Sequence, residues 1–145
     1  MSGAVVSQGE ESDAVLLDSA LLATLRSAQP QAINEGVVLT LRDGAFLLGG
    51  LCGKTSYGWL HIDVLWIDPD HRGMGHGRKL MNAARDAARA HRCHGMWLDT
   101  SSRDARDFYL SLGFSTFGRL ANRPDQTPHE HRRWFLSAPI DDEGD

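Results

Sequence analysis

Residues 68–80 read DPDHRGMGHGRKL, from Asp68 to Leu80, and no other stretch of the chain says more about its fold. Glycines stand at the alternate positions 73, 75 and 77, directly before a helical pattern. Glycine permits positive φ and lets a ligand come close to the backbone. The helix that follows offers unpaired N–H groups and the positive end of its dipole. The stretch therefore predicts an anion site suited to a phosphate or pyrophosphate.

The spacing of these glycines excludes the two commonest nucleotide loops. A Walker loop needs a Gly-Lys-Ser/Thr triplet, which residues 68–80 lack. A Rossmann fingerprint would need a glycine where Arg78 stands. The spacing alone leaves the identity of the phosphate ligand open.

The segments around the loop predict a mixed α/β fold. Apolar spacing indicates a helix over 12–28 and short strands over 37–41 and 45–51, joined at Asp43-Gly44 by a type I′ turn. The glycines at 49, 50 and 53 predict a bend or loop after the second strand. Further elements are expected as a strand over 59–67, a helix over 78–91, a strand over 96–98, a helix over 105–112 ended by Gly113, and strands over 114–120 and 132–136. Antiparallel strands followed by a strand–helix–strand unit indicate a mixed sheet.

Two segments carry a family resemblance. Residues 72–77, RGMGHG, resemble the acetyl-CoA pyrophosphate loop of the GNAT N-acetyltransferase superfamily. Residues 105–114, ARDFYLSLGF, resemble a second segment of that family, with the predicted strand 96–98 between them. The resemblance implies a GNAT-type fold, in which a mostly antiparallel central sheet holds one parallel strand–helix–strand unit and helices flank it. The length of the chain and its lack of internal repeats predict a single domain over 1–145, which the resemblance makes a GNAT-like N-acetyltransferase domain, and the acidic residues 141–145 are expected to form a solvated tail.

The resemblance further implies acetyl-CoA as co-substrate. Its pantetheine arm would lie beside the end of strand 59–67, and its pyrophosphate would lie in the glycine loop. Ser102 stands where many family members have an asparagine that contacts pantetheine. The implied cofactor-binding residues are Leu65, Trp66, Ile67, Arg72, Gly73, Met74, Gly75, His76, Gly77, Arg78, Ser102, Phe108 and Tyr109.

The catalytic candidates are Tyr109 and Asp63. Tyr109 matches the family's tyrosine near the thioester sulfur, which implies a general acid for the leaving thiolate. Strand alternation places His61, Asp63, Leu65 and Ile67 on one face. Asp63 is therefore the first candidate for the base and His61 the second, and the alternatives for either residue are action through a water molecule or binding of a cationic acceptor.

Composition narrows the partners. A net charge of -4 and a pI near 5.9 argue against a dedicated nucleic-acid binder. We expect neither a membrane span nor a signal peptide, and Cys52 and Cys93 as reduced thiols favour a cytoplasmic protein. The histidines near Cys93 and near residue 130 lack a full ligand set, so no metal is expected.

The predicted reaction is transfer of the acetyl group of acetyl-CoA to a primary amine by direct attack. One alternative is a non-catalytic acyl-CoA-binding or regulatory domain on the same fold. Another is an interaction module whose loop binds a different phosphorylated ligand. The acceptor, a small-molecule or peptide amine, is not identified by the sequence, and its pocket is expected around residues 24–36 and 121–131. The resemblance is also compatible with a homodimer.

Overall fold

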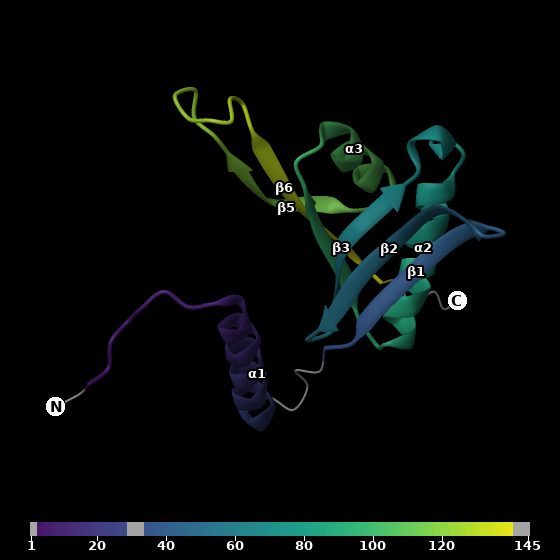
Figure 1. Ribbon diagram of the computed structural model, residues 1–145. Coiled ribbons are helices and arrows are strands. Elements are labelled where there is room, and N and C mark those ends of the chain that lie inside the picture. Colours follow the sequence, from purple (N-terminus) through teal and green to yellow (C-terminus); the bar gives the residue numbers. More distant parts are fainter. Residues whose placement is uncertain (1–2, 29–33, 141–145) are drawn as a thin grey trace. The chain divides into compact units, whose positions relative to one another are not determined.

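The structure is a computed structural model that describes residues 3–28 and 34–140 (Figure 1). Its contacts divide the chain into two compact units, Met1–Ile33 and Asn34–Asp145. The first unit holds helix α1 (Glu11–Ala28), which confirms the helix predicted there. The Asp13 carboxylate caps α1 by accepting a 2.8 Å hydrogen bond from the backbone N–H of Glu10. The single-domain arrangement stays a prediction, and the tail 141–145 lies outside the described residues.

The second unit is built on a mixed sheet. Within residues 34–140, six strands form one sheet in the order β1-β2-β3-β4-β6-β5. Every neighbouring pair is antiparallel except β3 and β4, which run parallel. The strands are β1 (Gly36–Asp43), β2 (Phe46–Ser56), β3 (Trp59–Ile67), β4 (Gly95–Thr100), β5 (Ser115–Ala121) and β6 (Arg132–Pro139). The predicted mixed α/β fold is confirmed.

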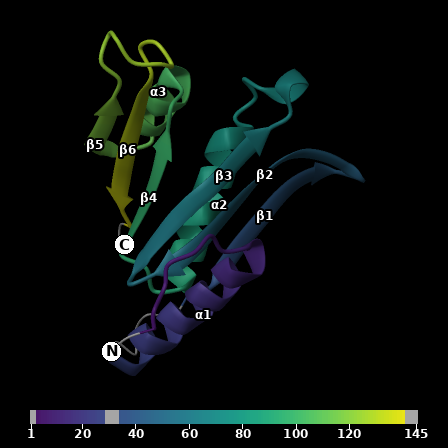
Figure 2. The ribbon, with the colours of Figure 1, turned by 60° about the vertical axis from the view of Figure 1, so that its left-hand side comes forward.

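Two helices cover one face of this sheet. Helix α2 (His76–Ala90) makes the crossover from β3 to β4, and helix α3 (Arg103–Ser111) follows β4. The buried side of α2 is narrow because two of its residues are alanines, so the helix lies close to the strands. Figure 2 shows α2 running behind β1, β2 and β3. The largest fully buried side chains of this core are Leu51, Leu60, Met96, Leu98 and Leu136.

The hairpin between β1 and β2 is confirmed, but its predicted turn type is wrong. Asp43 pairs with Phe46, so Gly44 and Ala45 are the central residues of the turn. Gly44 has φ +61°, whereas Ala45 is not among the residues with positive φ. A type I′ turn needs positive φ at both central positions, whereas a type II′ turn needs it only at the first. The turn between β1 and β2 is therefore of type II′.

The predicted bend after residue 51 is also wrong, because β2 continues to Ser56. A Cβ on Gly49 would lie 2.6 Å from the carbonyl oxygen of Trp66, and one on Gly53 would lie 2.5 Å from that of His61. These glycines are in the strand because the backbone of β3 approaches too closely for any larger residue.

Strands β3 and β4 pair over only part of their length. The parallel pairs are Trp59 with Gly95, Leu60 with Met96, and His61 with Trp97. Beyond the last pair the two strands diverge (Figure 2), although β3 continues to Ile67 and β4 to Thr100. The backbone of β3 that faces β4 therefore has no strand partner beyond His61 in the described part of the chain.

A membrane-spanning helix is not found within residues 3–28 and 34–140, where no helix combines the necessary length and apolar character.

Candidate active site

The glycine-rich loop leads from β3 into α2 with its backbone exposed. A short 3₁₀ helix, Pro69–His71, turns the chain, and the Asp68 carboxylate holds that turn by accepting hydrogen bonds from Asp70 N at 3.3 Å and His71 Nδ1 at 2.7 Å. Gly73 and Gly75 have φ of +80° and +83°. A Cβ built on either glycine has no described atom within 4 Å. Open space, rather than protein packing, therefore lies over these two positions within the described residues.

Helix α2 begins directly after Gly75, which is its N-cap. Gly75 has no side chain with which to cap the helix, so the first N–H groups of α2 are left for a ligand or solvent. His76 Nδ1 is buried and has no hydrogen-bond partner within the described residues. Both features fit an anionic group bound at this end of α2.

A cavity of about 570 Å³ lies where the loop meets the diverging part of β3 and helix α3. It is lined by Leu65, Ile67, His71, Arg72, Gly73, Gly75, His76, Gly77, Arg78, Ser102, Asp104, Ala105, Phe108 and Tyr109. We call it the loop cavity. Its volume is in the range of small-ligand sites.

Most cofactor-binding residues named from the sequence line the loop cavity, but Trp66 and Met74 do not. Trp66 is 41% exposed because the pleat of β3 turns it away from the side of Leu65 and Ile67, and Met74 is 63% exposed. His71, Asp104 and Ala105 line the cavity without having been named. Each lies within a few residues of a predicted cofactor-binding residue, so the two motifs were the sequence signal from which these three residues could have been predicted.

Several lining residues are held by contacts of their own. Arg72 Nε donates a 3.1 Å hydrogen bond to the carbonyl oxygen of Ile67. Ser102 is the N-cap of α3, and its Oγ accepts a 3.1 Å hydrogen bond from Ala105 N. A Cβ on Gly77 would lie 3.1 Å from Cζ of Phe108. Gly77 therefore allows α2 to pack closely against α3, in addition to its place in the loop.

Tyr109 lines the loop cavity from α3 while most of its side chain is buried. It is 8% exposed and its ring lies 5.4 Å from that of Phe108 and 5.7 Å from that of Phe114. Burial raises the pKa of Tyr109 above its ordinary value of 10.0. Its hydroxyl therefore stays protonated at neutral pH, as a proton donor must.

Asp63 occupies a β-bulge, and this overturns the predicted alternation along β3. Cys52 pairs with Val64 and Gly53 pairs with Ile62, so Asp63 is the extra residue. An extra residue reverses the facing of all later side chains. Leu65 and Ile67 therefore lie on the face covered by α2 and α3, while His61 lies on the face opposite these two helices.

Charged groups from three strands lie together on the face opposite α2 and α3. His61 Nδ1 lies 3.1 Å from Asp63 Oδ1, and His61 Nε2 lies 3.8 Å from Asp99 Oδ1. Asp99 Oδ2 accepts a 2.6 Å hydrogen bond from Arg133 Nη1. His61 Nε2 is buried and lacks a hydrogen-bond partner in the described parts of the chain. The two carboxylates stand on β3 and β4 just past their last pair, one on each side of the divergence.

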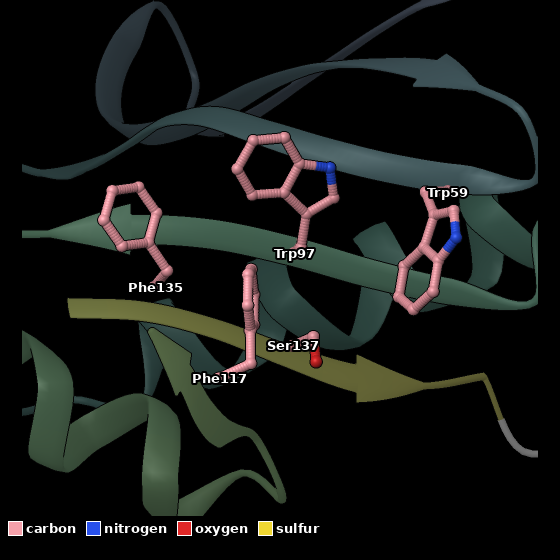
Figure 3. Close-up of a pocket in the computed structure, with 5 residues that line it drawn as sticks. All are labelled: Trp59, Trp97, Phe117, Phe135 and Ser137. Atoms are coloured by element: carbon pink, nitrogen blue, oxygen red, sulfur yellow. The ribbon is translucent and has the colours of Figure 1, made fainter. Parts of the chain in front are cut away.

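A second cavity, of about 540 Å³, opens on the same face. It is lined by Trp59, Trp97, Phe117, Phe135 and Ser137, from four neighbouring strands, and we call it the aromatic pocket (Figure 3). An adjoining cavity of about 400 Å³ shares Trp59 and Trp97 with it and also includes His61 and Lys54. The sequence analysis predicted the acceptor pocket elsewhere, around residues 24–36 and 121–131, of which 29–33 lie outside the described residues.

The thiols show no sign of a metal site. Cys93 is buried, and burial together with the nearby Glu35 raises the pKa of its thiol. Over residues 3–28 and 34–140, no three His, Cys, Asp or Glu side chains gather as metal ligands.

Comparison with known proteins now identifies the family. The model of the acetyltransferase (GNAT) family matches residues 13–114, which is most of the chain. The chain belongs to the GNAT family. Both motifs noted in the sequence lie within the matched range.

Two curated relatives that are named as acetyltransferases match part of the chain. An acetyltransferase of Agrobacterium fabrum is 37% identical over 83 residues, which are 57% of this chain and 61% of the relative. Blasticidin-S acetyltransferase of Streptomyces morookaense is 39% identical over 85 residues, which are 57% of this chain and 59% of that relative. The matched region thus spans about three fifths of the length of these relatives.

Solved structures confirm the GNAT-type fold. A chain from Agrobacterium tumefaciens, assigned to the acetyltransferases, has a TM-score of 0.80 and 24% identity, over 96% of this chain and 99% of its own. A chain from Bacillus anthracis, assigned as a streptothricin acetyltransferase and solved in complex with acetyl coenzyme A, has a TM-score of 0.65 and 19% identity, over 77% and 68%. The GNAT family match ends at residue 114, so Phe117, Phe135 and Ser137 of the aromatic pocket lie beyond it.

Proposed function

We propose that this chain is an N-acetyltransferase that transfers the acetyl group of acetyl-CoA to the primary amine of an acceptor. The observation that carries the proposal is the loop cavity, because one space is bordered by the glycine loop, the unpaired edge of β3 and Tyr109. Membership of the GNAT family gives independent support.

The residues of the loop cavity fit acetyl-CoA. The backbone at Gly73 and Gly75 and the first turn of α2 would hold the pyrophosphate, with Arg72 and Arg78 adding positive charge. The backbone of Leu65 and Ile67 would pair with the amides of pantetheine, because it has lost its partner on β4 in the described structure. Bound acetyl-CoA supplies the thioester that the acceptor attacks.

The transfer would proceed by direct attack. The amine nitrogen forms a bond to the thioester carbonyl carbon, and the carbon–sulfur bond breaks. The departing sulfur takes the proton of the Tyr109 hydroxyl, and the nitrogen gives up a proton to the Asp63 carboxylate. Exchange of protons with solvent then restores both side chains. The products are the acetylated amine and free CoA.

Asp63 is proposed as the base because of its position at the bulge. It is 37% exposed and stands at the divergence of β3 from β4, so an acceptor can reach it. His61 holds the carboxylate from one side through Nδ1 and is proposed as its positioning residue. The sequence had left these two residues as first and second candidates.

The acceptor is proposed to be a small-molecule amine. One relative at 39% identity bears the name of blasticidin S, which is the basis for this class. Location in the cytosol stays a prediction made from the sequence.

The first test is calorimetric titration with acetyl-CoA and CoA, followed by an amine screen with detection of the free thiol. We expect saturable binding of acetyl-CoA and release of thiol that depends on the amine. Asp63→Asn should keep acetyl-CoA binding and lower turnover by about a hundredfold. Binding without turnover on any amine would instead favour the non-catalytic acyl-CoA-binding alternative. Absence of binding would exclude both.

A further inference from the structure

The walls of the aromatic pocket are held in place by specific packing contacts. Gly95 leaves the space that the ring of Trp59 fills, since a Cβ there would overlap that ring. His94 holds the same ring edge-on, with centroids 4.9 Å apart. Two local features of the chain thus fix the position of one wall.

The opposite wall is fixed by a bulge in β5. Thr116 pairs with Leu136 and Gly118 pairs with Phe135, so Phe117 is the extra residue. The bulge turns Phe117 toward Trp97, with ring centroids 6.5 Å apart and planes at 70° (Figure 3). Phe117 is 60% exposed, although a large apolar ring in this position gains nothing from water. Its exposed ring is therefore accessible to a ligand that enters the aromatic pocket.

The rim of the aromatic pocket on the side of the loop cavity is acidic. Asp63 and Asp99 stand there, with His61 between them stacked on Trp97. Arg133 pairs with Asp99, and Lys54 lines only the adjoining cavity, on the side of Trp59. At the divergence of the strands, Asp63 is therefore the carboxylate whose partner within the described residues is a histidine rather than an arginine or lysine.

We propose that the aromatic pocket and its acidic rim select a small acceptor with a flat aromatic body next to a protonated primary amine. This inference rests on the proposed acetyl transfer and specifies its substrate class. The rings hold the flat body by stacking and attract the cation through their faces. Asp63 and Asp99 hold the ammonium group at the divergence of β3 and β4, beside the loop cavity. There the ammonium group loses one proton to Asp63, which passes it to solvent, and the neutral amine then attacks and gives a second proton to the freed carboxylate.

The size and shape of the pocket favour such a small molecule over a peptide. A volume of about 540 Å³ suits a compact ligand. A peptide would need backbone donors and acceptors along its path, whereas the pocket is lined by four aromatic rings and a single hydroxyl, that of Ser137.

Three probe ligands separate the ring from the charge. 1-Naphthylmethylamine has both, cyclohexylmethylamine has the amine without a flat ring, and 1-naphthylmethanol has the ring without the charge. Calorimetry on the full chain, with CoA present, should give the first probe an affinity about tenfold higher than either of the others. 1-Naphthylmethylamine should also be acetylated with a higher kcat/KM than cyclohexylmethylamine.

Phe117→Ala should weaken binding of 1-naphthylmethylamine about tenfold while leaving acetyl-CoA affinity unchanged. Leu120→Ala, an exposed apolar residue of the same strand that does not line the pocket, is the matched control and should leave the affinity for the amine within about twofold. Asp99→Asn should weaken binding of the amine but not of the alcohol.

Equal affinity for the flat and the non-flat amine would overturn the inference, as would unchanged amine binding in Phe117→Ala. Preference for a tetrapeptide with a free N-terminus over 1-naphthylmethylamine would overturn it as well. The acetyl-CoA titration keeps the two proposals distinguishable. Amine binding without acetyl-CoA binding would defeat the proposed function alone, and acetyl-CoA turnover on unrelated amines would defeat this inference alone.

Discussion

The imidazole of His61 lies flat on the indole of Trp97, with ring centroids 3.8 Å apart and planes 10° from parallel. The same two residues form the last backbone pair between β3 and β4. The stack therefore fixes the imidazole at the point where the strands part, with Nδ1 toward Asp63. Orientation of the carboxylate is the role that this geometry gives to His61.

Replacing the imidazole while keeping the stack tests that role. His61→Phe retains a flat ring against Trp97 but removes both nitrogens, so Asp63 loses its partner. We expect turnover to fall about tenfold, with acetyl-CoA affinity unchanged and unfolding free energy within about 1 kcal/mol of the parent. Steady-state kinetics and urea denaturation measure these quantities. Unaltered turnover in His61→Phe would remove the imidazole from the mechanism.

Gly75 and Gly44 offer a matched pair for testing the loop. Both have positive φ, and a Cβ on either meets no described atom within 4 Å, so Gly75→Ala and Gly44→Ala should each cost about 1 kcal/mol of stability. Only Gly75→Ala places a methyl group in the loop cavity. Calorimetry should find acetyl-CoA affinity reduced about tenfold in Gly75→Ala and unchanged in Gly44→Ala. Equal loss in both variants would indicate a general effect on stability.

Tyr109→Phe separates proton donation from binding. The ring and its contacts remain, and only the hydroxyl is removed. We expect kcat to fall about a hundredfold while the dissociation constant of acetyl-CoA changes less than about twofold. Rapid-quench measurement of the chemical step is the appropriate assay, because product release can mask a slower transfer. A loss confined to acetyl-CoA affinity would make Tyr109 a binding residue.

The raised pKa of Tyr109 also predicts how stability depends on pH. The pKa is higher in the folded chain than in the unfolded chain, where it is near 10.0, because burial disfavours the phenolate. The folded state therefore holds this proton more tightly. The contribution of this proton to the free energy of unfolding is fully present below pH 10 and is lost as the pH rises through the pKa of Tyr109 in the folded chain. Unfolding free energy measured across this range should decline less steeply in Tyr109→Phe than in the parent, and Tyr57→Phe, which alters a more exposed tyrosine, serves as the control.

The close approach of β2 and β3 predicts a stability difference between two further glycines. Gly53→Ala would place a methyl group 2.5 Å from the carbonyl oxygen of His61, which is backbone and cannot swing away. The expected cost is about 1–3 kcal/mol. Gly36→Ala, whose Cβ meets no described atom within 4 Å, should change the unfolding free energy by less than about 1 kcal/mol. Thermal denaturation of both variants tests the difference.

Local patterns were enough to predict the loop and most of the elements. The glycines at 73 and 75, the helix after them and Tyr109 lie in short continuous segments, and each segment carries its own spacing. The bulge at Asp63 could not be predicted in this way, because it depends on the register of β3 against β2. Simple alternation consequently gave Leu65 the wrong face.

The aromatic pocket could not be predicted from the sequence either, because it depends on which strands are neighbours in the sheet. Its rings come from four strands, and Trp97 and Phe135 are brought together only by the sheet order in which β6 pairs with β4. The spacing of residues along the chain does not predict this order of the strands. The glycine at 95 was a signal in principle, since it makes room for the ring of Trp59, but only the folded neighbour gives it that meaning.

The reversal of facing at Asp63 has a kinetic consequence. Leu65 lies on one face of the sheet and His61 on the other. Acetyl-CoA and the acceptor amine would therefore bind from opposite faces and meet only where β3 and β4 diverge. Neither then obstructs the other, which favours random addition, intersecting initial-rate plots and independent departure of the two products. We also expect the acceptor side to tolerate substitution, because Phe117 and Phe135 do not line the loop cavity that would hold the donor.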